Sequence, residues 1–577
     1  MPRKALMAAA AVVVVGGLAV IAGRDYPHVL RAAPGTPPAL VLPPATNQPA
    51  PSEGRPTDEV RFDRLAKVES PEARRSVGEY QYASAATPEQ ESGWPYWQPT
   101  GTADERYGDV AANPVKLVAE QPVSTFSVDV DTAAYANVRR FLTDGVLPPV
   151  DAVRTEELIN YFSYDYPLPE SSEAPFRADV ALFDSPWDEG SRIIRIGLQG
   201  YDIPAAVRPP ANLVFLVDTS GSMDSPDKLP LLKQSLRLLT EQMRPEDSVA
   251  IVAYAGDAGV VLESTKGSER LKIRAAIDAF AAGGSTAGAE GIRQAYALAE
   301  AAFRKEAVNR VILATDGDFN VGITDPGQLE DFVARKRESG VYLSILGFGT
   351  GNLNDLLMQK LAQAGNGNAA YIDSLMEARK VLVEEMGSTV FTIADDVKIQ
   401  IEFNPAEVAE YRLIGYETRL LAREDFNNDK VDAGDVGSGH SVTALYEITP
   451  PDSASRLVDD LRYGGSVRPA AAADGELAYL RIRYKLPGAD ESRLIEQPVL
   501  ASARTSFEAA PVDARFATAV AAFGQLLRND PHVGRLAFAD IHRIGRAARG
   551  ADEFGYRSEF LRLVQAAGSA AALETLN

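Results

Sequence analysis

The sequence predicts an α/β protein whose centre is a doubly wound, mostly parallel sheet with helices on both faces. Between residues 209 and 391, short continuous apolar runs alternate with longer segments of helical period. Apolar runs without polar alternation indicate strands that are covered on both faces. Short oxygen-bearing side chains directly follow these runs, at the edge of such a sheet where ligands collect. The flanking sequence predicts a small α+β unit before this core, and a β-rich unit with helices after it.

The first 24 residues predict a transmembrane signal anchor or a signal peptide. Behind Arg3 and Lys4, nineteen uncharged residues run from Ala5 to Gly23, enough for a helix of roughly 28 Å that crosses the hydrocarbon layer. The preceding charges favour a cytoplasmic amino terminus. Cleavage after Ala22 stays open as an alternative, since small residues stand there. We therefore expect a cell-envelope protein, anchored in the inner membrane with its body in the periplasm, or secreted if this segment is cleaved.

Residues 25–114 predict a largely disordered, proline-rich tether. Nine prolines lie between Pro27 and Pro56 among Ala, Thr, Gln and Asn, a composition that favours extended states over a packed core. After the tether, residues 115–208 form the predicted α+β unit. Its expected strands cover 124–130, 175–183 and 192–198. Its expected helices cover 132–142 and 153–162.

The central domain is predicted over residues 209–391. Its expected strands cover 213–217, 248–254, 310–314 and 341–346, and its expected helices cover 228–243, 270–280, 289–303, 328–338 and 353–364. This regular alternation favours parallel pairing. Beyond it, residues 392–511 predict a β-rich unit and residues 512–577 predict helices. The strands expected there cover 397–403, 409–420, 441–448 and 478–485.

Composition excludes several classes of function. The chain has 577 residues, and its 58 Lys+Arg against 80 Asp+Glu give a formal net charge of −22. Such an acidic chain argues against nucleic-acid binding, because phosphate contacts need clustered cations. The chain contains no Cys and only four His, which excludes disulfides and thiolate chemistry and leaves little for imidazole sites. A metal in this protein has to be held by oxygen atoms.

Three segments supply short oxygen ligands at the expected carboxyl edge of the central sheet. They are Asp218-x-Ser220-x-Ser222, then Gly283 to Gly288 with Thr286, and finally Thr315-Asp316-Gly317-Asp318. Glycine lets such loops bend and approach one another, and Ser, Thr and Asp oxygens suit a hard cation of near-octahedral geometry. Turn and helix-cap roles would explain any one motif alone. Three in this order predict a site for Mg²⁺, with Mn²⁺ also possible.

These motifs resemble the metal-ion-dependent adhesion site of von Willebrand factor type A (VWA) domains. The resemblance rests on Asp-x-Ser-x-Ser, a later Thr and a later Thr-Asp-Gly within residues 209–391. It implies that Ser220, Ser222 and Thr286 are direct metal ligands. It also implies that Asp218 and Asp316 act mostly through bound water. With few charges in its first shell, the ion stays electrophilic, so an Asp or Glu of a protein partner can supply its last ligand.

Two details of this assignment stay open. Ser285 could replace Thr286 as the ligand, and Asp318 is expected to be a solvated neighbour. The flanks also carry a resemblance: Pro122 to Asp131 and Glu156 to Phe162 resemble the amino-terminal extension of a bacterial envelope subgroup of VWA proteins, and Asp425 to Ile448 resembles its uncharacterised carboxy-terminal region. Members of that subgroup are often lipoproteins, whereas this chain has no cysteine to carry a lipid.

Three weaker features have ordinary explanations. Asp425, Asn427 and Asp429 have the opening spacing of a calcium loop, but the turn glycine and the bidentate Glu are missing, so an acidic hairpin loop is favoured. His440 is interpreted as a hydrogen-bonded structural histidine rather than a ligand. Three arginines at three-residue spacing are interpreted as a solvated helix face rather than a docking site for an acidic partner; they are Arg543, Arg546 and Arg549.

The sequence favours a binding module over an enzyme. The central domain has no His or Cys, and the chain has neither a Gly-x-Ser-x-Gly elbow nor a phosphate-binding loop, so we expect no catalytic residues and no nucleotide. The expected partner is a protein with an exposed Asp or Glu, and the membrane is reached through the N-terminal segment. An assembly scaffold that works with a partner ATPase is the alternative. A metal-assisted hydrolase is a weaker one.

Overall fold

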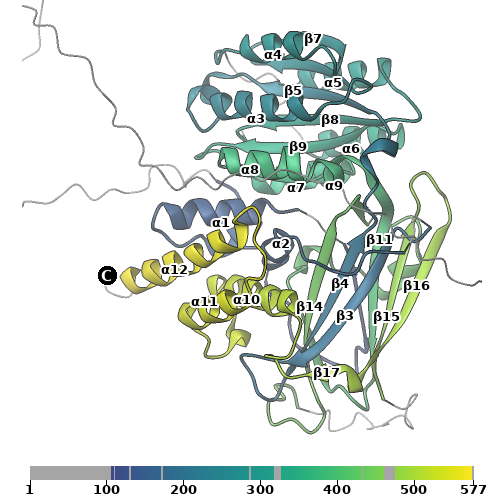
Figure 1. Ribbon diagram of the computed structural model, residues 1–577, viewed down its shortest axis with the longest axis vertical. Helices are drawn as coiled ribbons and strands as arrows, with labels where there is room; N and C mark the ends of the chain where they lie inside the picture. Colours follow the sequence, from purple (N-terminus) through teal and green to yellow (C-terminus); the bar gives the residue numbers. More distant parts are fainter. Residues whose placement is uncertain are drawn as a thin grey trace, which may run out of the picture. The chain divides into compact units, whose positions relative to one another are not determined.

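The central sheet contains six strands in the order β10-β9-β8-β5-β6-β7, and only the edge pair β6 and β7 is antiparallel (Figure 1). The strands are β5 (Ala211–Asp218), β6 (Ser248–Tyr254), β7 (Ala258–Lys266), β8 (Val308–Thr315), β9 (Tyr342–Phe348) and β10 (Ala369–Ile372). The predicted doubly wound, mostly parallel sheet is confirmed. Sequence patterns miss β7, a mostly exposed edge strand, and β10, which has only four residues.

This computed structural model describes residues 105–108, 111–128, 131–170, 173–284, 288–317, 326–431, 433–459 and 475–574. The predicted anchor, residues 1–24, and nearly all of the predicted tether lie outside these ranges. Within them, no helix combines the length and the apolar composition needed to cross a bilayer.

Helices cover both faces of the central sheet, as the side chains of β5 illustrate. Leu213, Phe215 and Val217 face a core shared with α3, α4 and α8, whereas Val214 and Leu216 face a core shared with α5, α6 and α7. The helical segments of this domain are α3 (Leu229–Gln242), α4 (Arg270–Asp278), α5 (Gly288–Ala301), α6 (Pro326–Glu338), α7 (Asp355–Ala364), α8 (Leu375–Arg379), the π-helical turn η4 (Lys380–Glu384) and α9 (Met386–Val390). Burial on both faces explains the continuous apolar run of β5.

The segments before and after the central domain together build a two-sheet body, here called the sandwich. One sheet has the order β1-β12-β14-β4-β3-β17, and the other has the order β13-β11-β15-β16 with β2 beside β11. The strands are β1 (Lys116–Leu117), β2 (Val123–Ser127), β3 (Phe176–Asp184), β4 (Arg192–Gly200), β11 (Thr392–Phe403), β12 (Glu410–Ile414), β13 (Gly434–Gly437), β14 (Ser441–Thr449), β15 (Glu476–Lys485), β16 (Ser492–Leu500) and β17 (Arg504–Thr505).

Sequence analysis treats residues 115–208 and 392–511 as two units, but in the structure their strands share both sheets. β4 pairs with β14, and β2 pairs with β11. Ile196 from one sheet and Ile399 from the other lie in the same apolar core. Pairing between strands so far apart in the chain leaves no local pattern in the sequence, so the shared core appears only in the folded protein.

A layer of helices covers the other face of the larger sheet (Figure 1). It contains α1 (Ala133–Thr143), α2 (Thr155–Asn160), α10 (Val512–Leu527), α11 (Phe538–Ala547) and α12 (Tyr556–Glu574). Phe162 from the first part of the chain packs edge to face against Phe516 and Phe560 from the last part. The helices predicted at 132–142 and within 512–577 are therefore present, and they form one layer.

Buried ion pairs join this helical layer to the central domain. Arg139 of α1 lies 2.5 Å from Asp373 and 2.7 Å from Glu377, both in the central domain, and 3.0 Å from Glu559 of α12. Arg154, just before α2, lies 2.7 Å from Asp355 at the start of α7. The helical layer is thus joined to the central domain through α1 and through the residue that precedes α2.

Candidate metal site

Four of the five predicted site residues lie at the carboxyl ends of β5 and β8. Asp218 ends β5, Ser220 and Ser222 lie on the turn that follows it, and Asp316 comes directly after β8. β5 and β8 pair in parallel up to Val217 and Ala314, so the two loops leave the sheet side by side. Thr286, with Ser285, lies outside the described residues.

Asp218 is fixed by hydrogen bonds at both carboxylate oxygens. Oδ1 accepts from the Ser220 N–H at 2.9 Å, while Oδ2 accepts from the Tyr254 hydroxyl at 3.1 Å and the Thr315 hydroxyl at 3.3 Å. Burial raises the pKa of Asp218 above its ordinary value and the charge of Asp316 adds to this, although the hydrogen bonds from Ser220 and Tyr254 act against it. The carboxylate is therefore held in one orientation beside a second negative charge.

The serine hydroxyls lie in front of these carboxylates. Ser220 Oγ and Ser222 Oγ are 3.0 Å apart, and Ser222 also hydrogen-bonds to Asp316. The segment that leads to Thr286 is attached to the same turn: the Gly221 N–H donates to the Gly284 carbonyl at 3.1 Å, and the Gly283 N–H donates to the carbonyl of Thr219. The described flank of the second predicted loop thus lies against the first.

Asp316 has an internal counter-ion that sequence analysis missed. The ammonium of Lys228 donates to Asp316 Oδ2 at 2.9 Å and to Asn352 Oδ1 at 3.3 Å. Burial alone would raise the pKa of Asp316, but hydrogen bonds from Lys228 and Ser222 and the lysine charge hold it below its ordinary value. No sequence signal marks Lys228, whereas Tyr254, as the last residue of a predicted buried strand, could have been assigned to this edge.

These donors fit a hard divalent cation. Two hydroxyl oxygens converge on one point with two carboxylates beside them, and all are oxygen ligands of the kind that Mg²⁺ and Mn²⁺ accept. Within the described ranges, no three His, Asp or Glu side chains gather in a way that could hold a metal. Binding at this edge would therefore depend on the serine hydroxyls as well as on the aspartates.

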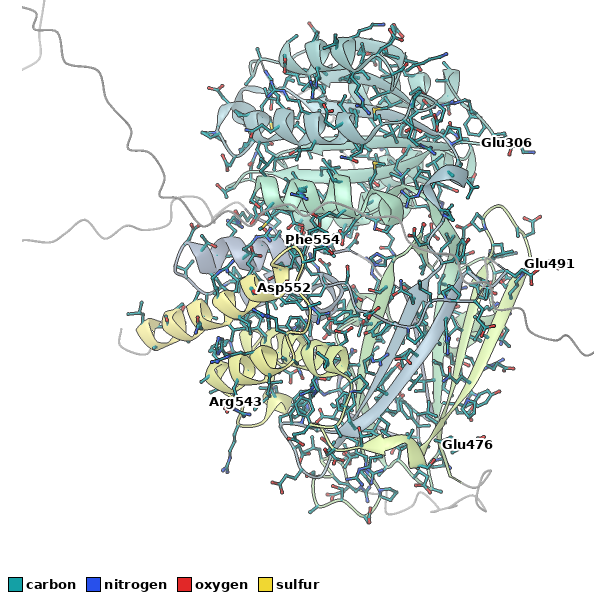
Figure 2. All side chains as sticks on the ribbon, viewed as in Figure 1. Glu306, Glu476, Glu491, Arg543, Asp552 and Phe554 are labelled. Atoms are coloured by element: carbon teal, nitrogen blue, oxygen red, sulfur yellow. The ribbon has the colours of Figure 1, made fainter. Side chains whose placement is uncertain are left out.

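The weaker sequence features play structural roles. Asp429 pairs with Arg483 at 3.0 Å and accepts from Ser492, so this carboxylate is already engaged within its loop. His440 Nε2 is buried and has no hydrogen-bond partner among the residues that the structure describes, which differs from the hydrogen-bonded histidine expected from sequence. Arg543 projects from α11 into solvent (Figure 2), its side chain is 70% exposed, and it forms an ion pair with its helix neighbour Asp540.

The fold and the order of its strands define a protein with a VWA domain, and sequence comparison agrees. The "von Willebrand factor type A domain" matches residues 212–385, "von Willebrand factor" matches residues 101–195, and "Uncharacterized protein YfbK, C-terminal" matches residues 388–570. The chain is 47% identical over 474 residues to YfbK of Escherichia coli, covering 81% of each protein. It belongs to the YfbK family of bacterial VWA proteins.

More distant relatives share only part of the chain. Inter-alpha-trypsin inhibitor heavy chain H3 of Homo sapiens is 25% identical over 41% of this chain and 28% of its own length. A solved von Willebrand factor type A structure from Catenulispora acidiphila is 16% identical, with a TM-score of 0.37 over 59% of this chain and 74% of that one. VWA domains typically mediate protein interactions and are generally binding modules rather than enzymes.

Proposed function

We propose that this protein is an exported binding module that recognises a protein partner through a divalent cation, Mg²⁺ or Mn²⁺. Ser220, Ser222 and Thr286 would ligate the ion, while Asp218 and Asp316 would act through bound water. The partner would supply an Asp or Glu as the last ligand. The supporting observation is the convergence of the two serine hydroxyls, 3.0 Å apart, beside two buried carboxylates at one edge of the sheet.

The chemistry of this donor set supports recognition rather than catalysis. The hydroxyls are neutral ligands, so the ion would keep most of its charge and attract a carboxylate from outside. His440 directly precedes the sandwich strand β14 and lines a cavity with Ala211 at the amino end of β5, away from this edge. We further propose that residues 1–24 anchor the protein in the inner membrane with the body in the periplasm.

Metal-dependent stability tests the site directly. The full-length protein should gain thermal stability when Mg²⁺ or Mn²⁺ replaces EDTA, since a ligand that binds only the native state stabilises it. Ser222→Ala should lose this gain. Ser225→Ala is the matched control, because Ser225 lies on the same turn but bonds to Asp227, and it should keep the gain. A wild-type protein that no divalent cation stabilises would rule out the metal site.

Partner recognition and anchoring need separate measurements. Envelope proteins that cross-link to the wild type in Mn²⁺ should no longer do so in EDTA or when Ser222→Ala replaces the wild type. Free glutamate should compete with these proteins and reduce their cross-linking. Recovery that is independent of metal would contradict the proposed mode of binding. For the anchor, the protein should stay in the membrane fraction after alkaline extraction. Release of the protein there would favour a cleaved signal peptide.

A further inference from the structure

Lys228 places a positive charge inside the candidate metal site. It directly precedes α3, and its side chain is only 9% exposed while that of Asp316 is fully buried. Its ammonium lies 2.9 Å from Asp316 Oδ2 and 3.3 Å from Asn352 Oδ1. A buried lysine is normally costly unless it is paired and hydrogen-bonded. Here both conditions are met by groups of the site itself.

The backbone around Lys228 keeps the ammonium in this position. Gly349, in the loop after β9, has a φ of +73°, and a Cβ built on it would lie 2.2 Å from Lys228 Cε, so the lysine stem crosses the bare glycine backbone. The same loop supplies Asn352. On its other side, the Gly351 N–H donates to Glu105 Oε1 at 3.1 Å, and the Tyr371 hydroxyl donates to the Gly349 carbonyl at 2.9 Å. The loop is thus fixed from both sides.

The charges of the site lead to the inference. Asp218 and Asp316 contribute −2 and Lys228 contributes +1, so a bound divalent cation leaves the site at +1. Without the lysine, the loaded site would be neutral. We propose that Lys228 is a positioning and specificity residue that weakens cation affinity and, in exchange, keeps the loaded site positive for an anionic last ligand. This inference rests on the proposed metal site.

Two consequences separate this role from simple packing. Without metal, Lys228 neutralises part of the buried negative charge, so its removal should lower the stability of the metal-free protein. With metal, the lysine repels the cation across a few ångströms, so its removal should tighten cation binding. A purely structural lysine would change stability by the same amount with and without metal, and its loss would leave cation affinity unchanged or weaker.

The test uses the full chain as wild type, Lys228→Met, Lys228→Arg and Lys272→Met. Met removes the charge and preserves most of the stem, and Arg keeps the charge. Lys272 is exposed on α4, near the amino ends of the strands, so Lys272→Met changes the net charge equally away from the site. Mn²⁺ affinity is measured by isothermal titration, and thermal midpoints are measured in EDTA and in saturating Mn²⁺.

We expect Lys228→Met to bind Mn²⁺ about tenfold more tightly than the wild type. Its midpoint should fall in EDTA and recover in Mn²⁺. Lys228→Arg and Lys272→Met should stay within about threefold of the wild-type affinity. If Lys228→Met does not fold in EDTA, the Mn²⁺ concentration that restores folding gives the same comparison. Unchanged or weaker Mn²⁺ binding by Lys228→Met overturns the inference.

Acetate serves as the probe for the anionic last ligand. In the Mn²⁺-loaded protein, acetate should displace water bound to the ion and so reduce the relaxation rate of the water protons. The wild type should show this effect at an acetate concentration about tenfold lower than Lys228→Met needs. Equal acetate affinity in the two proteins overturns the specificity role. A wild type that binds neither Mn²⁺ nor Mg²⁺ refutes the proposed function itself, whereas a wild type that binds metal with unaltered behaviour in Lys228→Met refutes only the role of the lysine.

Discussion

Replacing Arg139 by Met should destabilise the protein strongly, because this side chain joins three parts of the chain. Its guanidinium is bidentate to Asp373 at 2.7 and 2.5 Å, and it also contacts Glu377 at 2.7 Å and Glu559 at 3.0 Å. The arginine side chain is 8% exposed. Its loss would leave three nearby carboxylates without their shared cation, and removing one partner of a buried pair costs about 3–5 kcal/mol.

The assay is urea unfolding of the full chain followed by circular dichroism. At pH 7.5, Arg139→Met should lower the free energy of unfolding by about 3–5 kcal/mol. Arg543→Met is the matched control, since Arg543 is 70% exposed (Figure 2), and it should change stability by less than about 0.5 kcal/mol.

The pH dependence gives a second check. Burial raises the pKa of Glu377 above its ordinary value, although Arg139 lowers it; without the arginine, this pKa rises further. Protonation then relieves the unpaired charge, so the loss of stability in Arg139→Met should shrink as the pH falls from 7.5 to 5. A loss below about 1 kcal/mol, or a loss that is the same at both pH values, would refute the reasoning.

Three further perturbations have expected outcomes. Burial, with a neighbouring lysine, lowers the pKa of His440 from 6.5 to about 4. As the pH falls, the histidine is therefore protonated in the unfolded chain before it is protonated in the folded protein. The free energy of unfolding should fall by up to about 3 kcal/mol between pH 6.5 and 4. His440→Gln should remove that part of the pH dependence, and identical profiles would contradict this account. Gly349→Ala should lower the free energy of unfolding by about 1–3 kcal/mol, because φ is +73° and the new Cβ would meet Lys228. Gly145→Ala should lower it less, since φ is +79° but no atom of the described residues lies within 4 Å of the new Cβ. Equal losses in urea or thermal unfolding would show that the contact with Lys228 is unimportant. Glu105→Gln should lower the free energy of unfolding by about 1–3 kcal/mol. The carboxylate of Glu105 is 1% exposed, pairs with an arginine at 2.9 Å and accepts a hydrogen bond from a backbone N–H of the loop after β9. Unchanged hydrogen exchange in that loop would count against this contact.

Sequence patterns alone identify four of the six strands of the central sheet and the order of the loops that follow them. A strand buried on both faces must be apolar throughout, so Leu213–Val217 identifies β5 without any knowledge of its neighbours. Parallel strands bring their carboxyl ends to one edge, so Asp218, Ser220, Ser222 and Asp316 could be assigned to one site from their positions after the runs. These are properties of short segments, which a linear pattern records.

The packing of the flanks and the surroundings of the carboxylates follow from contacts that form only in the folded chain. β4 pairs with β14 across more than two hundred residues of chain, and such pairing depends on which surfaces meet rather than on any local period. Lys228 reaches Asp316 because the loop after β9 passes beneath its stem at Gly349. A lysine before a helix is ordinary in sequence, and Lys228 joins the candidate metal site only because the loops after β5, β8 and β9 meet there.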